Sequence, residues 1–279
     1  MQLGFVKMHG LGNDFVILDA TRQSFTPDST TIASLAERRT GIGCDQVLLL
    51  ESAQRPDAAV FYRTFNADGL EVEQCGNGVR CIASLIDERM RAAGESVEEI
   101  VLDSVAGAIR ARLLDDDQVS VNMGVPDFSP ASLPFEATTE AYVYTLDVAG
   151  TKVEIGAVSI GNPHAVLTVP SVDTAPVDRL GPAIECHPRF GNRTNVEFME
   201  VQNDSHIRLR VHERGTGETR ACGTGACGAV AVGRRHGVLK ETVAVDLPGG
   251  RLTVSWPGDG HDIWLSGPAE KSFEGTIEL

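Results

Sequence analysis

The spacing of hydrophobic residues changes in the same way at two places along the chain. Residues 60–65 are rich in β-branched and aromatic types, and residues 207–211 alternate apolar with polar side chains, so both stretches predict strands. Each strand is followed by a turn and then by a Cys-Gly-x-Gly sequence, at 75–78 and at 222–225. The same order of strand, turn and motif therefore occurs in both halves.

A helix is predicted after each motif. In the first half, apolar residues recur at three- and four-residue steps until Gly94, a natural helix end. In the second half, the run 226–235 is small and apolar and ends at Gly237. Gly228 and Gly233 lower its helix propensity, so we expect them to allow close packing in a buried central helix.

Many short strands and few helices predict an α+β fold, with a mixed or antiparallel sheet wrapped around a central helix in each half. Prolines 126, 130 and 134 predict a crossing between two domains near residue 125. The further strands are expected at 3–8, 15–19, 99–103, 108–113, 119–123, 142–148, 153–160, 165–169, 243–247, 251–256 and 262–266.

A constant offset between polar residues indicates that the halves are duplicates. The motif cysteines are 147 residues apart (222 − 75), and the same offset relates Asn66 to Glu213. Further upstream the offset is 149 and relates Gln46 to Asn195. Matching order and near-constant spacing predict two similar domains with one motif each, and sites of this kind often lie between domains.

Composition excludes several classes of partner. The net charge of -15 disfavours nucleic acid and anionic membrane surfaces, because phosphate binding needs clustered Lys and Arg. The sequence contains no apolar run that could cross a bilayer and begins without a secretory signal pattern, so we expect a cytoplasmic protein.

Six cysteines are present, and a cytoplasmic chain of this length keeps them reduced. Their spacing includes no C-x-x-C pair, so we predict no structural zinc site and no other metal. Four of them are interpreted as small buried hydrophobic residues: Cys44, Cys81, Cys186 and Cys227.

Cys75 and Cys222 are interpreted differently, because each precedes a predicted helix. The N–H groups and partial positive charge at a helix start favour a thiolate and lower a cysteine pKa to about 3.5–7.5. The same N–H groups can hold a carboxylate. Two such helix starts facing one carbon would let one thiolate remove its proton while the opposite thiol donates another, which inverts the centre without a cofactor.

Other interpretations remain open on these residues alone. The two cysteines could be buried in Gly-rich turns, or form a redox pair, and neither motif matches a nucleotide-binding loop. A pyridoxal-phosphate enzyme would need a Schiff-base lysine, and none of the four lysines lies in the paired motifs. Asn13, Asn66 and Asn162 lie beside Gly, Ala or Pro, where asparagine is also a common turn residue.

The motifs together resemble those of the diaminopimelate epimerase family. They span almost the whole chain in the family's order: residues 7–15, 66–69, 73–80, 161–164, 193–197, 213–215 and 221–225. The resemblance implies two pseudosymmetric domains, 1–124 plus 267–279 and 125–266, with the active site in the cleft between them. It implies interconversion of LL- and meso-diaminopimelate, on the route to lysine and peptidoglycan, and a homodimer.

The resemblance also assigns roles to individual residues. Cys75 and Cys222 would be the catalytic pair, with His164 and Glu213 tuning the thiols and positioning the substrate amine. Backbone N–H groups of Gly76, Asn77, Gly223 and Thr224 would hold the reacting carboxylate. The substrate's other end would be held by Asn66, Asn162, Asn195 and the Arg214 side chain, with Asn13 and Gln46 lining the pocket.

Two other enzymes with this fold are alternatives. A proline or hydroxyproline racemase carries a different sequence near its second cysteine, and several asparagines with an arginine suit a substrate with a second polar end. An isomerase of phenazine metabolism would not need both cysteines. A binding protein without catalysis is disfavoured because both cysteines are present.

Overall fold

The computed structural model describes residues 2–72, 76–114 and 118–279, and the chain forms two compact units. The first unit comprises Met1–Val121 and Gly267–Leu279, and the second comprises Asn122–Ser266. Within the described residues, no helix is both long enough and apolar enough to cross a membrane.

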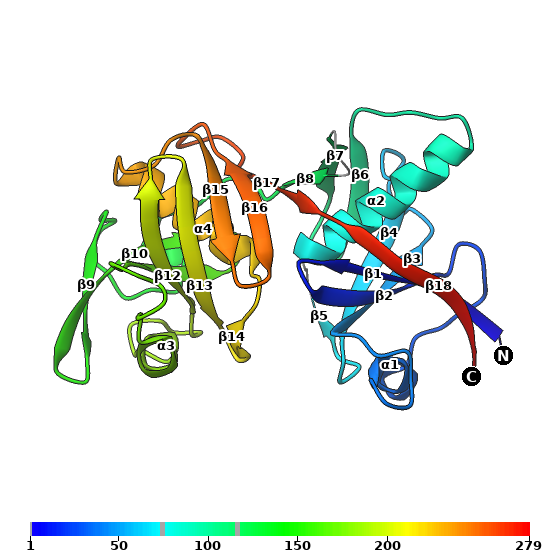
Figure 1. Ribbon diagram of the computed structural model, residues 1–279, viewed down its shortest axis with the longest axis horizontal. Coiled ribbons are helices and arrows are strands. Elements are labelled where there is room, and N and C mark those ends of the chain that lie inside the picture. Colours follow the sequence, from blue (N-terminus) through cyan, green and yellow to red (C-terminus); the bar gives the residue numbers. More distant parts are fainter. Residues whose placement is uncertain (1, 73–75, 115–117) are drawn as a thin grey trace. The chain divides into compact units, whose positions relative to one another are not determined.

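The first unit is a mixed sheet around one long helix, α2 (Gly76–Ala92), which contacts β1, β2, β6 and β7 (Figure 1). A second, short helix is α1 (Ser29–Ala36). The strands are β1 (Gln2–Gly10), β2 (Asn13–Asp19), β3 (Gln46–Glu51), β4 (Val60–Asn66), β5 (Glu71–Val72), β6 (Ile100–Ser104), β7 (Ile109–Leu113), β8 (Gln118–Asn122) and β18 (Glu270–Glu278). The C-terminal strand β18 pairs with β1 and so returns to the start of the chain.

The second unit has the same plan around α4 (Gly223–Arg235), which contacts β10, β11, β12 and β16. A short helix, α3 (Val177–Glu185), packs against β12 and β13, and a 3-10 turn covers Pro130–Ser132. The strands are β9 (Tyr144–Val148), β10 (Thr151–Ser159), β11 (Pro163–Thr168), β12 (Asn195–Asn203), β13 (His206–Glu213), β14 (Gly217–Thr219), β15 (Thr242–Leu247), β16 (Gly250–Ser255) and β17 (Trp264–Pro268).

Strand registers confirm the duplication. In the first unit Phe15 pairs with Gln46 across parallel β2 and β3, and in the second His164 pairs with Asn195 across parallel β11 and β12. Both pairs are related by the offset of 149 (15 + 149 = 164; 46 + 149 = 195). The next ladders match as well, with β3–β4 and β4–β5 repeated by β12–β13 and β13–β14.

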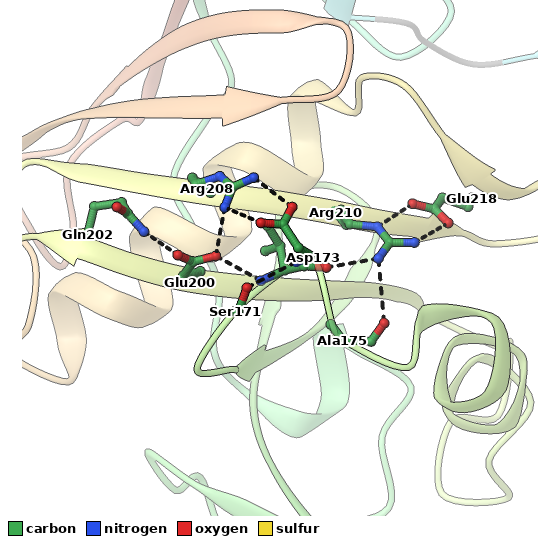
Figure 2. Close-up of polar contacts among 9 residues, drawn as sticks. Ser171, Asp173, Ala175, Glu200, Gln202, Arg208, Arg210 and Glu218 are labelled. Atoms are coloured by element: carbon green, nitrogen blue, oxygen red, sulfur yellow. Dashed lines mark hydrogen bonds and ion pairs between the residues drawn. The ribbon is translucent and has the colours of Figure 1, made fainter.

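An ion pair recurs at the same place in both ladders. Arg63 and Glu71 form a bidentate pair with N–O distances of 2.8 and 2.6 Å, and Arg210 and Glu218 do the same at 2.6 and 2.8 Å. In the second unit Arg210 also donates to the carbonyl oxygen of Val172, at 2.9 Å. Figure 2 shows how these bonds tie the loop before α3 to β13.

Both central helices are built as their sequences predict. Val79, Ile82, Leu85 and Ile86 of α2 are buried, and Gly94 follows the helix with a φ of +80°. In α4, a Cβ on Gly228 would lie 3.2 Å from the His164 ring, and one on Gly233 would lie 2.4 Å from Leu239 Cδ1. The glycines therefore allow close packing, as expected.

The two short helices were not expected from the sequence. Helix α1 follows Asp28, whose Oδ1 accepts a hydrogen bond of 2.9 Å from Thr31 N and caps the helix. Helix α3 contains Gly181 and Pro182, both of which oppose a helix by propensity. Its Gly181 faces His212 of β13, so tertiary packing overrides propensity there: a Cβ at 181 would lie 2.6 Å from the His212 ring.

Candidate active site

The candidate residues of each unit lie at one edge of its sheet. Parallel strands β2 and β3 begin at this edge and antiparallel β4 ends there, and the equivalent β11, β12 and β13 repeat this arrangement. In the first unit the candidates are Asn13, Gln46, Asn66, Gly76 and Asn77. In the second they are Asn162, His164, Asn195, Glu213, Arg214, Cys222, Gly223 and Thr224. Cys75 lies outside the described residues.

Gln46 and Asn66 are direct neighbours in the first unit. They are paired across β3 and β4, and Gln46 Nε2 donates to Asn66 Oδ1 at 2.9 Å. Within the part of the chain that the structure describes, Gln46 Oε1 is buried without a hydrogen-bond partner. This oxygen is an acceptor that a bound ammonium group could use.

The first turn of α2 is tied to Asn13. Asn77 Nδ2 donates to Asn13 Oδ1 at 3.1 Å, and Arg80, itself fully buried, donates to Asn77 Oδ1 at 2.9 Å. Asn13 Nδ2 donates to Asp45 Oδ2 at 3.0 Å. Asp45 and Arg80 fix the side chains of Asn13 and Asn77, and neither was expected from the sequence to have a role in the site.

Cys222 is the N-cap residue of α4, as expected, and its thiol is buried with 5% exposure. Its Sγ lies 3.6 Å from Thr224 Oγ1. A Cβ on Gly225 would lie 3.3 Å from Sγ and 3.0 Å from Glu197 Oε1, so the close approach of these groups depends on glycine. The first turn of α4 thus packs directly against a carboxyl group.

The expected lowering of the Cys222 pKa is wrong for this environment. Burial raises the pKa of the Cys222 thiol well above its usual range, and the negative charges of Glu213 and Glu197 raise it further. Hydrogen bonds from Thr224 and from the Gly225 backbone act in the opposite direction but are outweighed. Two nearby carboxyl groups and the loss of water therefore dominate over the helix start.

His164 is held between two polar side chains in the interior of the second unit. Its Nδ1 lies 2.7 Å from Glu197 Oε1, and its Nε2 lies 2.8 Å from Asn162 Oδ1. Asn162 Nδ2 in turn donates to Thr224 Oγ1 at 3.5 Å. The residues Glu197, His164, Asn162 and Thr224 form a continuous chain of contacts that ends beside Cys222.

Glu197 was not assigned a role from the sequence. By the offset of 149 its counterpart in the first unit is Leu48, so the duplication gave no signal. The available signal was its position two residues after Asn195, which places both side chains on one face of β12.

Asn195 and Arg214 connect two strand ends. Asn195 Oδ1 accepts from the backbone amide of Arg214 at 3.0 Å, and its Nδ2 donates to Pro163 O at 3.0 Å. The Arg214 side chain is exposed, with Nη1 donating to Asn192 O at 3.3 Å. Glu213 accepts from the Thr219 hydroxyl. Asn195 therefore fixes the backbone from which Arg214 extends.

Glu185, at the end of α3, supports the same backbone. Its Oε1 accepts from Gly215 N at 2.8 Å, and its Oε2 lies 2.9 Å from His212 Nε2. Burial acts to raise the pKa of the Glu185 carboxyl, but the Gly215 amide and His212 hold it below its ordinary value. Glu185 was not expected in this role, because α3 itself was not expected from the sequence.

No group of three or more His, Cys, Asp or Glu side chains is arranged to hold a metal ion among the residues described. The polar groups at the two sheet edges are instead amides, a histidine, a hydroxyl and backbone N–H groups, which together offer hydrogen-bond donors and acceptors. Such groups bind carboxylates and ammonium ions.

Comparison with known proteins gives a full-length match. The family model described as diaminopimelate epimerase matches residues 5–129 and 156–272. The chain belongs to the diaminopimelate epimerase family. The diaminopimelate epimerase of Alkalilimnicola ehrlichii is 55% identical, and that of Thioalkalivibrio sulfidiphilus is 54% identical, in each case over 100% of both chains.

Solved structures show the same fold as this diaminopimelate epimerase family member. A hydroxyproline epimerase from Agrobacterium vitis matches with a TM-score of 0.69 and 16% identity, covering 100% of this chain and 93% of that one. A phenazine biosynthesis protein of Bacillus anthracis matches with a TM-score of 0.69 and 17% identity, covering 100% of both chains. At these identities the likeness establishes the α+β fold with its repeated plan, and nothing further.

Proposed function

We propose that this protein interconverts LL- and meso-diaminopimelate, a step toward lysine and the peptidoglycan precursor. The observation that carries this proposal is the 55% identity, over the whole of both chains, to a protein named diaminopimelate epimerase. The amides and the arginine at the sheet edges support it, because the substrate carries two ammonium and two carboxylate groups.

The reaction uses two cysteines and no cofactor. The Cys75 thiolate takes the α-proton from one face of the carbon and becomes a thiol. Cys222 gives its thiol proton to the opposite face and becomes a thiolate, and the roles exchange in the reverse reaction. The high pKa of the Cys222 thiol supports this assignment, in which Cys222 is the protonated cysteine when the substrate binds.

The carbanion between the two transfers needs donors for its carboxylate. We assign this role to the backbone N–H groups of Gly76, Asn77, Gly223 and Thr224, which lie in the first turns of α2 and α4. In this proposal the two units are the two domains of the enzyme, and each contributes one cysteine and one helix start.

The other end of the substrate is assigned to Asn66, Asn162, Asn195 and the Arg214 side chain, with Asn13 and Gln46 lining the pocket. Glu213 is assigned to the substrate amine. Glu213 also acts on the reaction, because its charge raises the pKa of Cys222. His164 acts at one remove, since its two ring nitrogens contact Asn162 and Glu197. A homodimer in the cytoplasm completes the proposal.

The test is exchange of the α-proton in deuterated water. LL- and meso-diaminopimelate should both gain deuterium at the inverted centre, while proline and hydroxyproline supplied in the same way should not. Exchange of proline without exchange of diaminopimelate would assign the protein to the racemases of the same fold instead.

A further inference from the structure

The buried pair of Glu197 and His164 is a special feature of the second unit. Both side chains have 0% exposure. Their counterparts in the first unit, by the offset of 149, are Leu48 and Phe15, which lie under Gly78 as apolar neighbours. Since the same ladder forms with an apolar pair, the fold itself does not require a carboxyl group and an imidazole at these positions.

The contacts determine how many protons the pair holds. Asn162 Oδ1 lies 2.8 Å from His164 Nε2. In this orientation of the amide, Nε2 must carry a hydrogen, because an amide oxygen only accepts. The contact of 2.7 Å between Nδ1 and Glu197 Oε1 needs one more hydrogen, held by the ring or by the carboxyl group. The pair therefore holds two protons and has no net charge in either arrangement.

If the pair of His164 and Glu197 lost one of its two protons, the side-chain amide of Asn162 would have to rotate so that its oxygen and its NH2 group exchange places. The remaining hydrogen would lie on Nδ1 facing the Glu197 carboxylate, and Nε2 would become an acceptor. Only the NH2 group of Asn162 could then face the ring, which would turn the amide oxygen toward Thr224. The protonation of the buried pair thus decides whether Asn162 presents a donor or an acceptor at the sheet edge.

The surroundings favour the neutral pair. Glu197 Oε2 is buried and has no hydrogen-bond partner among the described residues, so a net negative charge there would lack compensation. Glu213 on β13 and Cys222 at the start of α4 are the titratable groups that face the pair, and α4 itself presents Gly225 and Gly228. Burial raises the pKa of the Glu197 carboxyl, Glu213 adds to the rise, and His164 opposes it.

We propose that Glu197 is a positioning residue: by sharing a proton with His164 it keeps a hydrogen on Nε2 and so holds the Asn162 amide with its N–H groups toward Thr224 and a substrate carboxylate. This assignment deepens the proposed function and rests on it for the identity of the ligand. The equivalent amide in the first unit is held differently, because Asp45 accepts from Asn13 Nδ2.

The proton placement is measured directly by nitrogen-15 NMR of histidine-labelled full-length protein. The signals of His164 are assigned by their absence from the His164→Phe variant. At neutral pH we expect a hydrogen on Nε2. An Nε2 without hydrogen, with the proton on Nδ1 alone, would overturn the proposal. This readout needs no activity, so it stands even if exchange into diaminopimelate is not observed.

Kinetics with diaminopimelate separate positioning from packing. Glu197→Gln offers an amide donor to Nδ1, so we expect a KM within about threefold of wild type. Glu197→Leu, the residue of the first unit, removes that donor and should raise KM by about tenfold, the factor for one neutral hydrogen bond, with a smaller change in kcat. Equal effects of the two substitutions, or none from leucine, would contradict the proposal.

The double variant His164→Phe/Glu197→Leu keeps the test valid if the single variant Glu197→Leu does not fold. It copies the apolar pair that the first unit already accommodates at Phe15 and Leu48. It should fold and show the same rise in KM as Glu197→Leu. A folded double variant with the KM of the wild type would overturn the proposal.

Discussion

His164 Nδ1 lies 2.7 Å from Glu197 Oε1 at the two positions where the first unit carries Phe15 and Leu48. The strand registers around these positions are the same in both units. The duplicated frame therefore carries an apolar interior in one unit and an ionisable one in the other. Cys222 therefore lies beside a buried ionisable pair for which the first unit has two apolar residues.

Replacing either catalytic candidate should stop inversion. Cys222→Ser and Cys75→Ser each remove a group that transfers a proton, so we expect kcat to fall by about 10²–10⁴-fold. Epimerisation is followed by the separation of LL- and meso-diaminopimelate. Cys186→Ser is the matched control. Cys186 was expected to be buried, but it is exposed, because it lies at the C-cap of α3. A comparable loss in the control, or none at Cys222, would reject the two-cysteine mechanism.

Glu213→Gln should lower the pKa of the Cys222 thiol. The Glu213 charge is one of the groups that raise this pKa, and its removal should let the thiolate form at lower pH than in the wild type. The pH dependence of thiol alkylation measures this, with the Cys222 signal identified by its loss in Cys222→Ala. Glu218→Gln is the control, since that carboxylate is paired with Arg210. An unchanged or raised pKa in Glu213→Gln would contradict the assignment.

Glu185 should make stability depend on pH. Its folded-state pKa lies below the ordinary 4.5, so the carboxylate stabilises the fold at neutral pH, and this contribution is lost as the pH falls through the folded-state pKa. Glu185→Gln should therefore cost about 1–2 kcal/mol at pH 7 and less at about pH 3. Urea unfolding at both pH values tests this. A difference between the two proteins that grows on acidification would be the wrong sign.

Gly181→Ala should disturb the same support by a steric route. The added methyl group would lie 2.6 Å from the His212 ring, which contacts Glu185. We expect about 1–3 kcal/mol of destabilisation from overpacking and a raised KM, because Gly215 and Arg214 depend on Glu185. Gly191→Ala is the control, since its nearest neighbour would be at 3.5 Å. Equal unfolding midpoints for the two variants would show that the contact relaxes freely.

The repeated ion pair should matter less than the loop contacts of its arginine. Glu218→Gln breaks a partly exposed pair and should cost about 1 kcal/mol or less. Arg210→Met should cost more, because it also removes the donors to the carbonyl oxygens of Val172 and Ala175 (Figure 2). Urea unfolding of the two variants makes the comparison. A greater cost for the glutamate change would mean that the ion pair dominates.

The duplication of the fold could be predicted from the sequence because the strands and central helices that repeat are each marked by local sequence patterns. The strand before each cysteine follows from alternation, and each central helix begins at its Cys-Gly-x-Gly motif and stops before a glycine of positive φ, Gly94 or Gly237. Helix α3 was not readable, because Gly181 and Pro182 argue against it and only packing on β13 selects it.

The roles around Cys222 show where sequence reasoning fails. The helix start was predicted correctly, but burial of the thiol and then the charges of Glu213 and Glu197 decide the direction of its pKa shift. Of these two carboxyl groups, Glu197 is distant in sequence and has leucine as its counterpart. A side chain brought close only by the fold leaves no periodic or duplicated trace. The amides Asn13, Asn162 and Asn195 could be proposed because each has an amide counterpart in the other half, whereas Asp45, Arg80, Glu185 and Glu197 have no such counterpart.

The pairing of β18 with β1 has a consequence for biogenesis. The partner of Gln2–Gly10 is a segment that the ribosome makes only after the entire second unit. The second unit is continuous in sequence and can close while translation proceeds, whereas the unit begun first must hold an unpaired strand edge until residues 270–278 emerge. A premature stop between the two would therefore damage the oldest part of the nascent chain, leaving its first strand open to chaperones or to aggregation.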